Sequence, residues 1–477
     1  MSVDAEFVRV HDKFTGRVTA EWPRDDRAAL AGKIGRAAAG FPLVRRTTPE
    51  ERLEIVRRVG VELERERERF IGLLVVEAGQ ARKFAVWEVE RVIGQARHFD
   101  QLIDLIRPVE LPAASGRNLL LREPYGVVGV ITPRNTPLLV PFYTLFSALG
   151  GGNAVVLRPS TLAPGPAVRL VELTVAAGCP ADAVQLSTAD GDTAAREFIE
   201  NPLVNVFMTY SNSGLGKENV IKMGRYLEGG AAGEGILRRV PGKLTKYVPE
   251  LAGNDPFIVL AGADLDRAVQ AAAWGGFANA GQLCISAKRL LVQAGIAEQF
   301  KERLREAAAG LKVGDPHRPD TDIGPLGRPE SLARAVVHVK KALAQGGRLV
   351  FGGQAADPFF YPTLIEFDRE RIKGSPKPDL WREESFAPLR TLVIFDTVEE
   401  AVQLAEDSPY GLGAAVFGPE KEALALAGRL TAGRVMINEG PLYGDNHLPV
   451  GGVKDSGLYG ATHKIQEVTY QKRIHIA

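Results

Sequence analysis

The chain has only two cysteines, Cys179 and Cys284, in 477 residues. A disulfide framework needs several cysteine pairs, and a structural zinc site usually needs about four cysteine or histidine ligands. The low count therefore excludes a disulfide-stabilised scaffold and argues against a zinc centre, and we expect no bound metal.

The chain also has no surplus of charge of one sign. Lys and Arg number 59 against 58 Asp and Glu, which gives a formal net charge of +1. Proteins that bind nucleic acids usually carry a basic surplus, so we expect no nucleic-acid partner. A hydrophobic share of 45% and a charged share of 25% are ordinary for a folded globular chain.

Long hydrophobic runs are missing as well. The longest apolar stretch, residues 127–156, is interrupted by Arg134, Asn135, prolines and glycines, so it does not resemble a membrane span. Residues 1–9 alternate in charge and lack the apolar segment of a targeting signal. We therefore expect no membrane association and a cytoplasmic location.

Helix and strand patterns indicate a doubly wound α/β fold with a parallel sheet. Residues 25–105 are helical in pattern, residues 106–124 are extended, and short apolar segments alternate with helical ones from residue 125 onward. Such alternation is typical of parallel strands joined by crossover helices. The expected strands are residues 127–131, 154–157, 184–186, 204–208 and 257–260, then 290–292, 391–395, 414–417 and 434–437, with a strand-like tail at 468–476.

Cys284 lies after an expected helix at 267–276 and a glycine turn, and it precedes an expected strand. A thiol in that position is able to face a cleft between two α/β units. From the residues alone, a catalytic cysteine and a cysteine buried for packing both remain open, and the second is the commoner case. Cys179 lies at a helix end between a glycine and a proline, and we interpret it as structural.

Three polar residues follow expected strands. Glu250 opens a turn where a carboxylate can act as a general base. Asn135 follows the 127–131 strand, at the sheet edge where α/β proteins bind ligands, and its amide can donate to an oxyanion. Ser211 opens a helix whose N-terminus suits a pyrophosphate, although the three-glycine dinucleotide motif is missing. Each residue also fits a role confined to forming its turn.

Nine motifs in order resemble those of the aldehyde dehydrogenase superfamily, of the NAD(P)-dependent, hydrolytic type. They are Ile131–Asn135 (ITPRN), Val156–Ser160 (VLRPS), Thr209–Ser211 (TYS), Glu250–Gly253 (ELAG), Gly281–Cys284 (GQLC), Val313–Pro316 (VGDP), Glu383–Pro388 (EESFAP), Tyr410–Leu412 (YGL) and Pro449–Gly457 (PVGGVKDSG). The resemblance extends from about Leu120 to the C-terminus. The separation of 34 residues between Glu250 and Cys284 is the one that such enzymes use.

The resemblance implies a mechanism for oxidising an aldehyde to a carboxylic acid. Cys284 would attack the aldehyde to form a thiohemiacetal, and Asn135 with the Cys284 backbone N–H would bind the oxyanion. Glu250 would activate the water that hydrolyses the later thioester. The small-molecule partner implied is therefore an aldehyde.

The resemblance also implies NADP or NAD as cofactor. The residues that match the family's cofactor-binding motifs are Ile131, Thr132, Arg158, Ser160, Thr161, Ser211, Leu251, Glu384 and Phe386. Glu384 matches the residue that binds the nicotinamide ribose. Arg158 stands where the family usually has Lys, and Thr161 stands where it often has a Glu that repels a 2′-phosphate. Arg with Thr removes that repulsion and adds a charge-assisted donor, which predicts a preference for NADP.

Four other positions depart from the family pattern. Tyr210 stands where the family often has Gly, and Ala252 replaces a Gly after the glutamate, so both add bulk near cofactor and substrate. Arg134 replaces a usual aromatic residue, and Val450 replaces a Phe of the substrate tunnel. The chain between Gly216 and Glu250 is longer than usual, and we interpret the glycine-rich residues 229–235 as a surface insertion.

The substrate tunnel is expected to be apolar. The residues that match its lining are Phe142, Tyr143, Leu283, Ile285, Tyr443 and Val450. This lining favours an apolar or aromatic aldehyde, unless the aromatic side chains belong to the core. His447 and Arg134 are able to bind a carboxylate, which keeps a semialdehyde open as the alternative.

Two further alternatives differ in function. An acylating enzyme would transfer the acyl group to coenzyme A, but such members tend to lack the base that Glu250 provides. A non-enzymatic binding protein on the same fold is supported by the departures at Tyr210 and Ala252. It is opposed by the joint presence of Cys284, Glu250, Asn135 and Glu384.

The resemblance implies three parts. Residues 1–107 and 125–250 would form a Rossmann-like coenzyme domain, residues 251–455 a second α/β catalytic domain, and residues 108–124 and 456–477 a small β oligomerisation arm. Because an exposed terminal strand needs a partner edge, we expect a homodimer or homotetramer.

Overall fold

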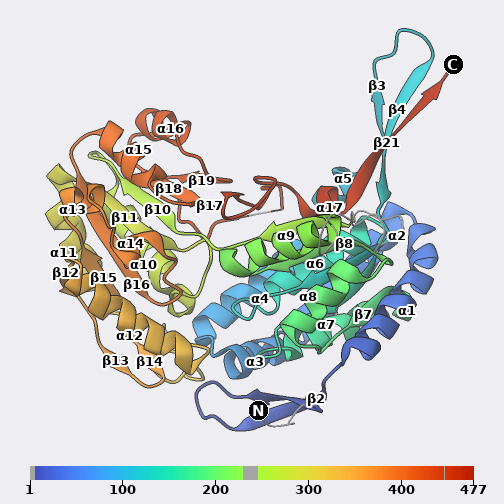
Figure 1. The fold of residues 1–477 in the computed structure, drawn as a ribbon, viewed down its shortest axis with the longest axis horizontal. Helices are drawn as coiled ribbons and strands as arrows, with labels where there is room; N and C mark the ends of the chain where they lie inside the picture. Colours follow the sequence, from blue (N-terminus) through green and yellow to red (C-terminus); the bar gives the residue numbers. More distant parts are fainter. Residues whose placement is uncertain (1–5, 229–244, 445) are drawn as a thin grey trace.

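The computed structural model describes residues 6–228, 245–444 and 446–477 (Figure 1). The glycine-rich stretch 229–235, which we interpreted as an insertion, lies outside the described residues. None of the described helices is long and apolar enough to cross a membrane.

Residues 27–104 are largely helical, as predicted for residues 25–105. Its helices are α1 (Arg27–Arg45), α2 (Pro49–Arg65), α3 (Arg67–Ala78), α4 (Arg82–Arg97) and α5 (Asp100–Asp104). Local sequence signals set their ends: Thr48 and Glu51 form a capping box at the start of α2, and Gly79 ends α3 in the left-handed conformation with φ 70°. A short hairpin of β1 (Phe7–His11) and β2 (Val18–Pro23) precedes them.

The first sheet is parallel throughout and has the strand order β7-β6-β5-β8-β9. Its strands are β5 (Val127–Ile131), β6 (Ala154–Arg158), β7 (Val184–Leu186), β8 (Val204–Tyr210) and β9 (Lys246–Glu250), and its helices are α6 (Leu139–Gly150), α7 (Gly165–Ala176), the 3-10 turn η1 (Ala181–Ala183), α8 (Gly191–Glu200) and α9 (Ser213–Glu228). The strand order reverses between β5 and β8. The carboxyl ends of strands at such a switch point are where α/β sheets bind ligands.

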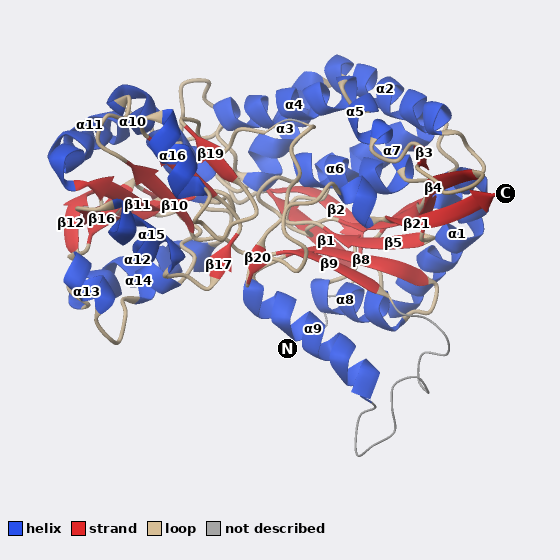
Figure 2. Cartoon of the chain, turned by 90° about the horizontal axis from the view of Figure 1, so that it is seen from above, coloured by secondary structure: helices blue, strands red, loops and turns tan. Residues whose placement is uncertain are grey.

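Both faces of this sheet are buried, which confirms the doubly wound class. Along β5, Val128 and Val130 pack into one hydrophobic cluster while Val127 packs into another. Along β6, Val155 and Val156 divide in the same way. Successive side chains of a strand point to opposite faces, so an unbroken apolar strand supplies two cores, one under each helical layer (Figure 2).

The second sheet has the order β12-β15-β16-β11-β10-β18-β19, and only β12 runs antiparallel. Its strands are β10 (Asp255–Val259), β11 (Ala287–Gln293), β12 (Arg348–Phe351), β15 (Thr363–Glu366), β16 (Leu389–Phe395), β18 (Ala414–Phe417) and β19 (Val435–Ile437). The α-helices around it are α10 (Leu265–Phe277), α11 (Ala297–Ala309), α12 (Pro329–Ala344), α13 (Arg369–Lys373), α14 (Asp379–Arg382), α15 (Val398–Glu406) and α16 (Glu420–Ala427). The predicted strand at 257–260 is β10, and it belongs to this second sheet.

Several short elements complete the chain. They are the 3-10 turns η3 (Ala278–Gly281) and η4 (Ala294–Ile296), the strand pairs β13 (Ala355–Ala356) with β14 (Phe359–Phe360) and β17 (Tyr410–Gly411) with β20 (Val453–Lys454), and the helix α17 (Lys464–Glu467).

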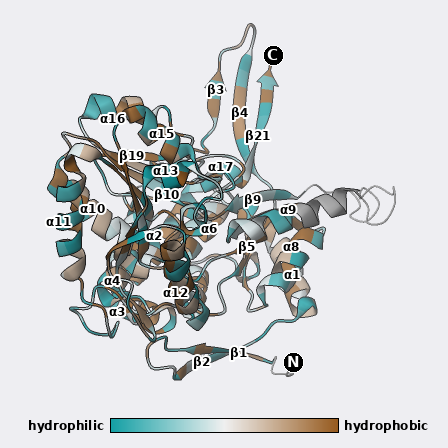
Figure 3. Cartoon of the chain, turned by 60° about the vertical axis from the view of Figure 1, so that its left-hand side comes forward, coloured by the Kyte–Doolittle hydropathy of each residue, from teal (hydrophilic) through white to brown (hydrophobic). Residues whose placement is uncertain are grey.

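A three-stranded antiparallel sheet projects from the body of the molecule (Figure 1). It consists of β3 (Val109–Leu111), β4 (Arg117–Pro124) and the C-terminal β21 (Thr469–Ile476), in the order β21-β4-β3. These strands carry both hydrophobic and polar residues (Figure 3), and Val109, Tyr470 and Ile476 are exposed. We name this sheet the arm.

The two large sheets meet end to end. The carboxyl ends of β5, β8 and β9 face the region where β10 and β11 of the second sheet begin, and only four residues separate Glu250 from the start of β10. This junction brings together chain segments that are far apart in the sequence.

Candidate active site

The loop that carries Cys284 has a strained backbone. It joins η3 to β11, and Asn279, Ala280 and Gly281 all adopt left-handed conformations with φ 52°, 53° and 67°. A Cβ on Gly281 would lie 2.3 Å from the carbonyl oxygen of Ala387, so only glycine fits there. Three consecutive residues in this conformation cost free energy, and such strain is typical of functional sites.

Hydrogen bonds from two buried polar side chains, Lys288 and Ser286, hold this loop in place. Lys288 Nζ donates to the carbonyl oxygens of Leu283 at 2.8 Å and Cys284 at 2.6 Å. Ser286 Oγ donates to the carbonyl of Gly275 at 2.7 Å. A Cβ on Gly253 would lie 2.6 Å from the Cys284 carbonyl oxygen, so the turn after Glu250 also needs glycine there. The loop is therefore held by hydrogen bonds to Lys288 and by close packing against the backbone at Gly253.

The Cys284 thiol is protonated at neutral pH. Burial raises its pKa to about 12, the negative charge of Glu250 adds to the increase, and the ammonium of Lys288 opposes it. The attacking species of a cysteine is the thiolate, so this thiol needs a base. Glu250 is the carboxylate whose charge acts most strongly on it.

Cys179 has a different environment. It lies just after α7 in the hydrophobic core, and burial raises its pKa to about 12 without a contribution from any charged group. It is a packing residue, in agreement with the interpretation from the sequence.

Glu250 is the last residue of β9 and is buried. Its Oε2 lies 3.5 Å from Nζ of Lys464, a buried lysine that also donates to the carbonyl of Val450 at 3.2 Å. Burial raises the pKa of Tyr143, and the charge of Glu250 adds to the increase, so that phenol is protonated beside the carboxylate. Glu250 thus has one buried cation beside it and a neutral hydroxyl group near it.

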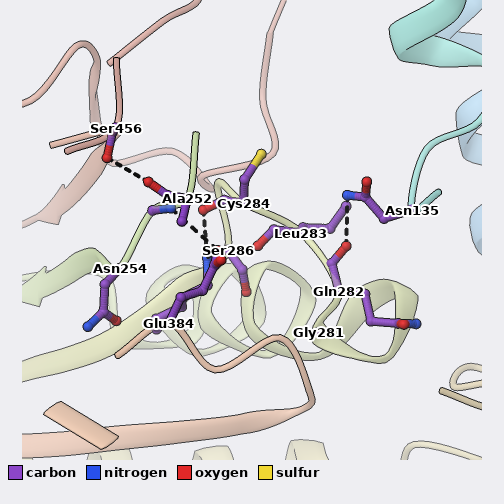
Figure 4. A network of polar contacts seen from close by, with 12 residues as sticks. Asn135, Ala252, Asn254, Gly281, Gln282, Leu283, Cys284, Ser286, Glu384 and Ser456 are labelled. Carbon is purple, nitrogen blue, oxygen red and sulfur yellow. Dashed lines mark hydrogen bonds and ion pairs between the residues drawn. The ribbon is translucent and has the colours of Figure 1, made fainter. Parts of the chain in front are cut away.

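Asn135 faces the cysteine loop (Figure 4). Its Nδ2 donates to the carbonyl of Gln282 at 2.9 Å, and an amide nitrogen carries a second N–H for another acceptor. The Asn135 carbonyl accepts from Asn279 Nδ2 at 2.8 Å and from Gln80 Nε2 at 3.0 Å. Glu88 accepts from Gln80 and from the backbone N–H groups that begin α6. This network ties Asn135 to the cysteine loop and to α6.

Glu384 lies under the cysteine loop, and the sulfur of Cys284 points away from it (Figure 4). Glu384 Oε1 is 3.1 Å from Lys288 Nζ and accepts from the Gly253 N–H at 3.3 Å. Phe386 follows Glu384 by two residues. The guanidinium of Arg134 lies over its ring, 5.6 Å from the ring centroid.

The other residues predicted to bind a cofactor surround the carboxyl ends of β5, β6 and β8. Thr132 is buried, and its Oγ1 has no hydrogen-bond partner among the described residues. Arg158 and Ser160 are buried, Ile131, Thr161 and Ser211 lie at or just after the same strand ends, and the buried Leu251 follows the neighbouring β9. The Ser211 N–H donates to the Glu250 carbonyl at 3.2 Å, which ties the start of the α9 turn to the end of β9.

Arg158 is a buried cation with other cations near it. Burial lowers its pKa to about 10, the charge of Asp190 opposes that change, and the charges of Arg24 and Arg328 add to it. Its Nε donates to the carbonyl of Ala189 at 2.9 Å, and at neutral pH the guanidinium remains charged. Thr161, three residues on, brings no negative charge to this group.

The residues predicted to line a tunnel have different environments. Phe142 is fully buried, with its ring centroid 4.7 Å from that of Phe146, which favours the core alternative for this residue. Tyr143 lies near Glu250, as described above. Leu283 and Ile285 pack in a small cluster beside the cysteine. Tyr443 is 48% exposed, and Val450 is partly buried beside Lys464.

That small cluster contains residues which sequence reasoning missed. Phe84 and Trp87 of α4 and Leu442 of a late loop pack with Leu283 and Ile285. Trp274 of α10 adds a ring 6.1 Å from Phe84 and 6.4 Å from Trp87, and it is 40% exposed. We name Phe84, Trp87, Trp274, Leu283, Ile285 and Leu442 the aromatic cluster. Its members come from four separate segments, so no single motif signals it.

Two buried lysines and one tyrosine were also missed as parts of the site. Lys288 follows the cysteine motif by four residues, and Lys464 follows the last motif, but neither has a spacing signal that points to the centre. Tyr210 was noticed only as a departure from the usual glycine. No group of three or more His, Cys, Asp or Glu that could hold a metal ion occurs among the described residues.

The fold and the site define an α/β enzyme with two Rossmann-like sheets and a single cysteine loop between them. A family model described as the aldehyde dehydrogenase family matches residues 1–474, so the resemblance begins well before Leu120. Aspartate-semialdehyde dehydrogenase 1 of Pseudomonas canavaninivorans is 34% identical over 455 residues, which cover 92% of this chain and 89% of that protein. A probable NADP+-dependent succinate-semialdehyde dehydrogenase of Synechocystis is 32% identical, with 93% of each chain covered.

A solved structure agrees with these relatives. The glyceraldehyde-3-phosphate dehydrogenase of Methanocaldococcus jannaschii, complexed with NADP, superposes with a TM-score of 0.89 at 30% identity and covers 99% of this chain and 100% of that one. The chain belongs to the aldehyde dehydrogenase family, a family of NAD(P)-dependent oxidoreductases that act on aldehydes.

Proposed function

We propose that this protein oxidises an aldehyde to a carboxylic acid at Cys284, with Glu250 as the base and Asn135 as an oxyanion donor. One observation carries the proposal: three residues from distant segments, each with the chemistry that its role requires, converge where the two sheets meet. The test is reduction of NADP+ or NAD+ by an aldehyde, followed through the absorbance of the reduced nicotinamide.

The first step is addition of the thiol to the aldehyde. Because the pKa of Cys284 is about 12 in the cofactor-free protein, the thiol must give up its proton as the sulfur–carbon bond forms. Glu250 is the acceptor that we propose for this proton. The carbonyl oxygen becomes an oxyanion, which the second N–H of Asn135 and the Cys284 backbone N–H are able to bind.

The residues around the strand ends fit a dinucleotide. Thr132 offers a buried hydroxyl that lacks a protein partner, and Ser211 lies at the start of a helix whose N-terminus favours a phosphate. Arg158, Ser160 and Glu384 would hold the ribose groups. A bound NAD(P) would supply the hydride acceptor that converts the thiohemiacetal into a thioester.

Hydrolysis then releases the acid. Glu250 first releases the thiol proton to solvent and then takes a proton from water, the water oxygen bonds to the acyl carbon, and the carbon–sulfur bond breaks with Cys284 as the leaving group. The buried Lys464 lies 3.5 Å from Oε2 of Glu250 and helps to hold this side chain in place. The buried base favours transfer of the acyl group to water over transfer to coenzyme A, and turnover that requires coenzyme A would contradict this.

For the cofactor we propose a preference for NADP over NAD. The support is the group of cations around Arg158, since the charges of Arg24 and Arg328 act on it and Arg24 Nε is buried without a hydrogen-bond partner among the described residues. A 2′-phosphate carries about two negative charges and binds best where several guanidinium groups point at it.

Thr161→Glu is expected to weaken NADP binding by about tenfold or more, with little effect on NAD. The new carboxylate would repel the 2′-phosphate and pair with Arg158. Titration of the dissociation constants for both cofactors measures the effect. Thr161→Gln has the same size without the charge and should keep the NADP affinity. Equal losses for NADP and NAD in the Glu variant would contradict the assignment.

For the substrate we propose an apolar or aromatic aldehyde. The support is the aromatic cluster. Two of its members, Leu283 and Ile285, stand on either side of the nucleophile in the sequence, and a third, Trp274, is partly exposed to solvent. The semialdehyde alternative is favoured by the names of two relatives. Arg134 was one residue suggested to bind a substrate carboxylate. Its guanidinium donates to Gln282 Oε1 at 2.7 Å and lies over the ring of Phe386, a proposed cofactor-binding residue, so these contacts already engage it.

Trp87→Ala is expected to lower kcat/KM for benzaldehyde by about tenfold while leaving acetaldehyde within about twofold. Loss of the ring removes apolar surface that only the larger substrate contacts, and a lost contact of this size costs about 1–3 kcal/mol. A panel with acetaldehyde, benzaldehyde and succinate semialdehyde in wild type and variant measures it. Highest wild-type efficiency with succinate semialdehyde would overturn the proposed substrate class.

We also propose a homodimer or homotetramer assembled through the arm, with residues 1–107 and 125–250 as the coenzyme domain and 251–455 as the catalytic domain. The support is the exposed outer edge of β21 and its apolar side chains, since an unpaired edge strand with such a face tends to find a partner. A monomer by light scattering would contradict the assembly. The cytoplasmic location stays a prediction from the sequence.

A further inference from the structure

Tyr210, the last residue of β8, has a buried hydroxyl with no hydrogen-bond partner among the described residues. The family often has glycine at this position, so the hydroxyl is a feature of this chain. An unpaired buried hydroxyl lowers the stability of the folded protein. A group that bears this cost beside reactive residues is a candidate for a functional role.

Strand pairing brings Tyr210 to the base. Tyr210 and Glu250 are register partners at the carboxyl ends of β8 and β9, which run parallel. Partners in adjacent strands point to the same face of a sheet, so the two side chains lie side by side. Besides burial, the groups that raise the pKa of the Tyr210 hydroxyl are Glu250, Tyr143 and Cys284, so all three lie near it. The hydroxyl therefore shares one small region with the base and the nucleophile.

The Tyr210 hydroxyl is a permanent hydrogen-bond donor. Burial raises its pKa well above the usual value, and the charge of Glu250 adds to the increase. At the pH of any ordinary assay the phenol keeps its proton. It can donate to an oxygen atom nearby, but it does not act as an acid or a base itself.

We propose that Tyr210 is a positioning residue for the water that hydrolyses the acyl group on Cys284. The hydroxyl donates to the water oxygen while the water donates one hydrogen to Glu250, and the remaining lone pair faces the acyl carbon. This inference rests on the function proposed above. Glu250 takes the proton, the oxygen–carbon bond forms, the carbon–sulfur bond breaks, and Cys284 leaves as a thiolate, so no oxidant or reductant enters this step.

Tyr210→Phe, which removes only the hydroxyl, is the test. The enzyme is acylated with p-nitrophenyl acetate in the absence of cofactor, which releases p-nitrophenol and leaves an acetyl group on the cysteine. Quenched samples analysed by mass spectrometry then follow the decay of the acyl-enzyme. We expect decay about tenfold slower than in wild type, with the rate and amplitude of the initial p-nitrophenol burst unchanged, as for the loss of one hydrogen bond.

Matched variants separate the outcomes. Tyr247→Phe, in the adjacent strand, removes a buried hydroxyl that lies 3.4 Å from Asn219 Nδ2 and should leave the decay unchanged. Tyr210→Gly, which restores the residue the family often has, should slow the decay as Phe does and serves if the Phe variant does not fold. An unchanged decay in Tyr210→Phe, or equal slowing of acylation and decay, overturns the role of Tyr210. Failure of wild type to acylate at Cys284 overturns the proposed function itself.

Discussion

Cys284→Ser is expected to lower kcat/KM for aldehyde oxidation by about a thousandfold or more, which corresponds to about 4 kcal/mol of transition-state stabilisation. The serine hydroxyl is a much weaker nucleophile than the thiol, and its pKa is higher still. The geometry of the loop should survive, because Lys288 and Asn135 bond to its backbone carbonyls and not to the sulfur. Formation of the reduced nicotinamide with a saturating aldehyde measures the effect.

The second cysteine provides the control for that experiment. Cys179→Ala removes the other thiol of the chain, which packs in the core at the end of α7 and has no charged group acting on it. This variant should keep the wild-type kcat while losing some thermal stability, since it leaves a small cavity. Equal activity in wild type and Cys284→Ser would refute the assignment of the nucleophile.

Glu250→Gln is expected to slow thioester hydrolysis by about a hundredfold to a thousandfold, the range typical for loss of a general base. A glutamine fills the same space and keeps a polar contact with Lys464, but it cannot take a proton. If Glu250 also accepts the thiol proton, formation of the thiohemiacetal should slow in the same variant. Rapid-quench measurements of acyl-enzyme formation and decay separate the two steps.

A buried glutamate away from the junction is the matched control. Glu197 of α8 pairs with Arg27 at 2.8 Å and accepts from Asn201 at 2.7 Å. Glu197→Gln therefore removes a buried carboxylate without touching the site, and its kcat should equal that of wild type. Wild-type decay of the acyl-enzyme in Glu250→Gln would contradict the role of Glu250 and leave that of Cys284 standing.

Most strands of the two large sheets were predictable, because each is a short apolar run with its own boundaries, but β12 and β15 of the second sheet were not predicted. The strands expected at 127–131, 184–186 and 414–417 occur with those bounds, and the helix expected at 267–276 lies within α10. A strand that is buried on both faces is continuously apolar, so a run of apolar residues identifies it from the local sequence alone. The local sequence did not show that β10 belongs to the second sheet, because its partners β11 and β18 are separate segments of the chain.

The candidate site was predictable only as far as its motifs reach. Cys284, Glu250 and Asn135 each stand in a short motif whose residue types imply a role. Phe142 shows the limit, since its position in the helix after Asn135 suggested a tunnel and its ring packs in the core against Phe146. The face of a helix that a side chain occupies depends on what packs against that helix.

The sequence by itself determined which residues have the chemistry: one cysteine in a glycine turn, a carboxylate 34 residues before it, and an Arg with a Thr where a repelling Glu is common. These are properties of residue type and local spacing. The tertiary structure alone decided what acts on those groups. It desolvates the partly buried Cys284 and raises the pKa of its thiol, brings Lys464 to 3.5 Å from Glu250, and makes Tyr210 the register partner of Glu250 in the adjacent strand. Burial and charge–charge distances arise only when separate strands and loops pack together, so no local pattern could contain them.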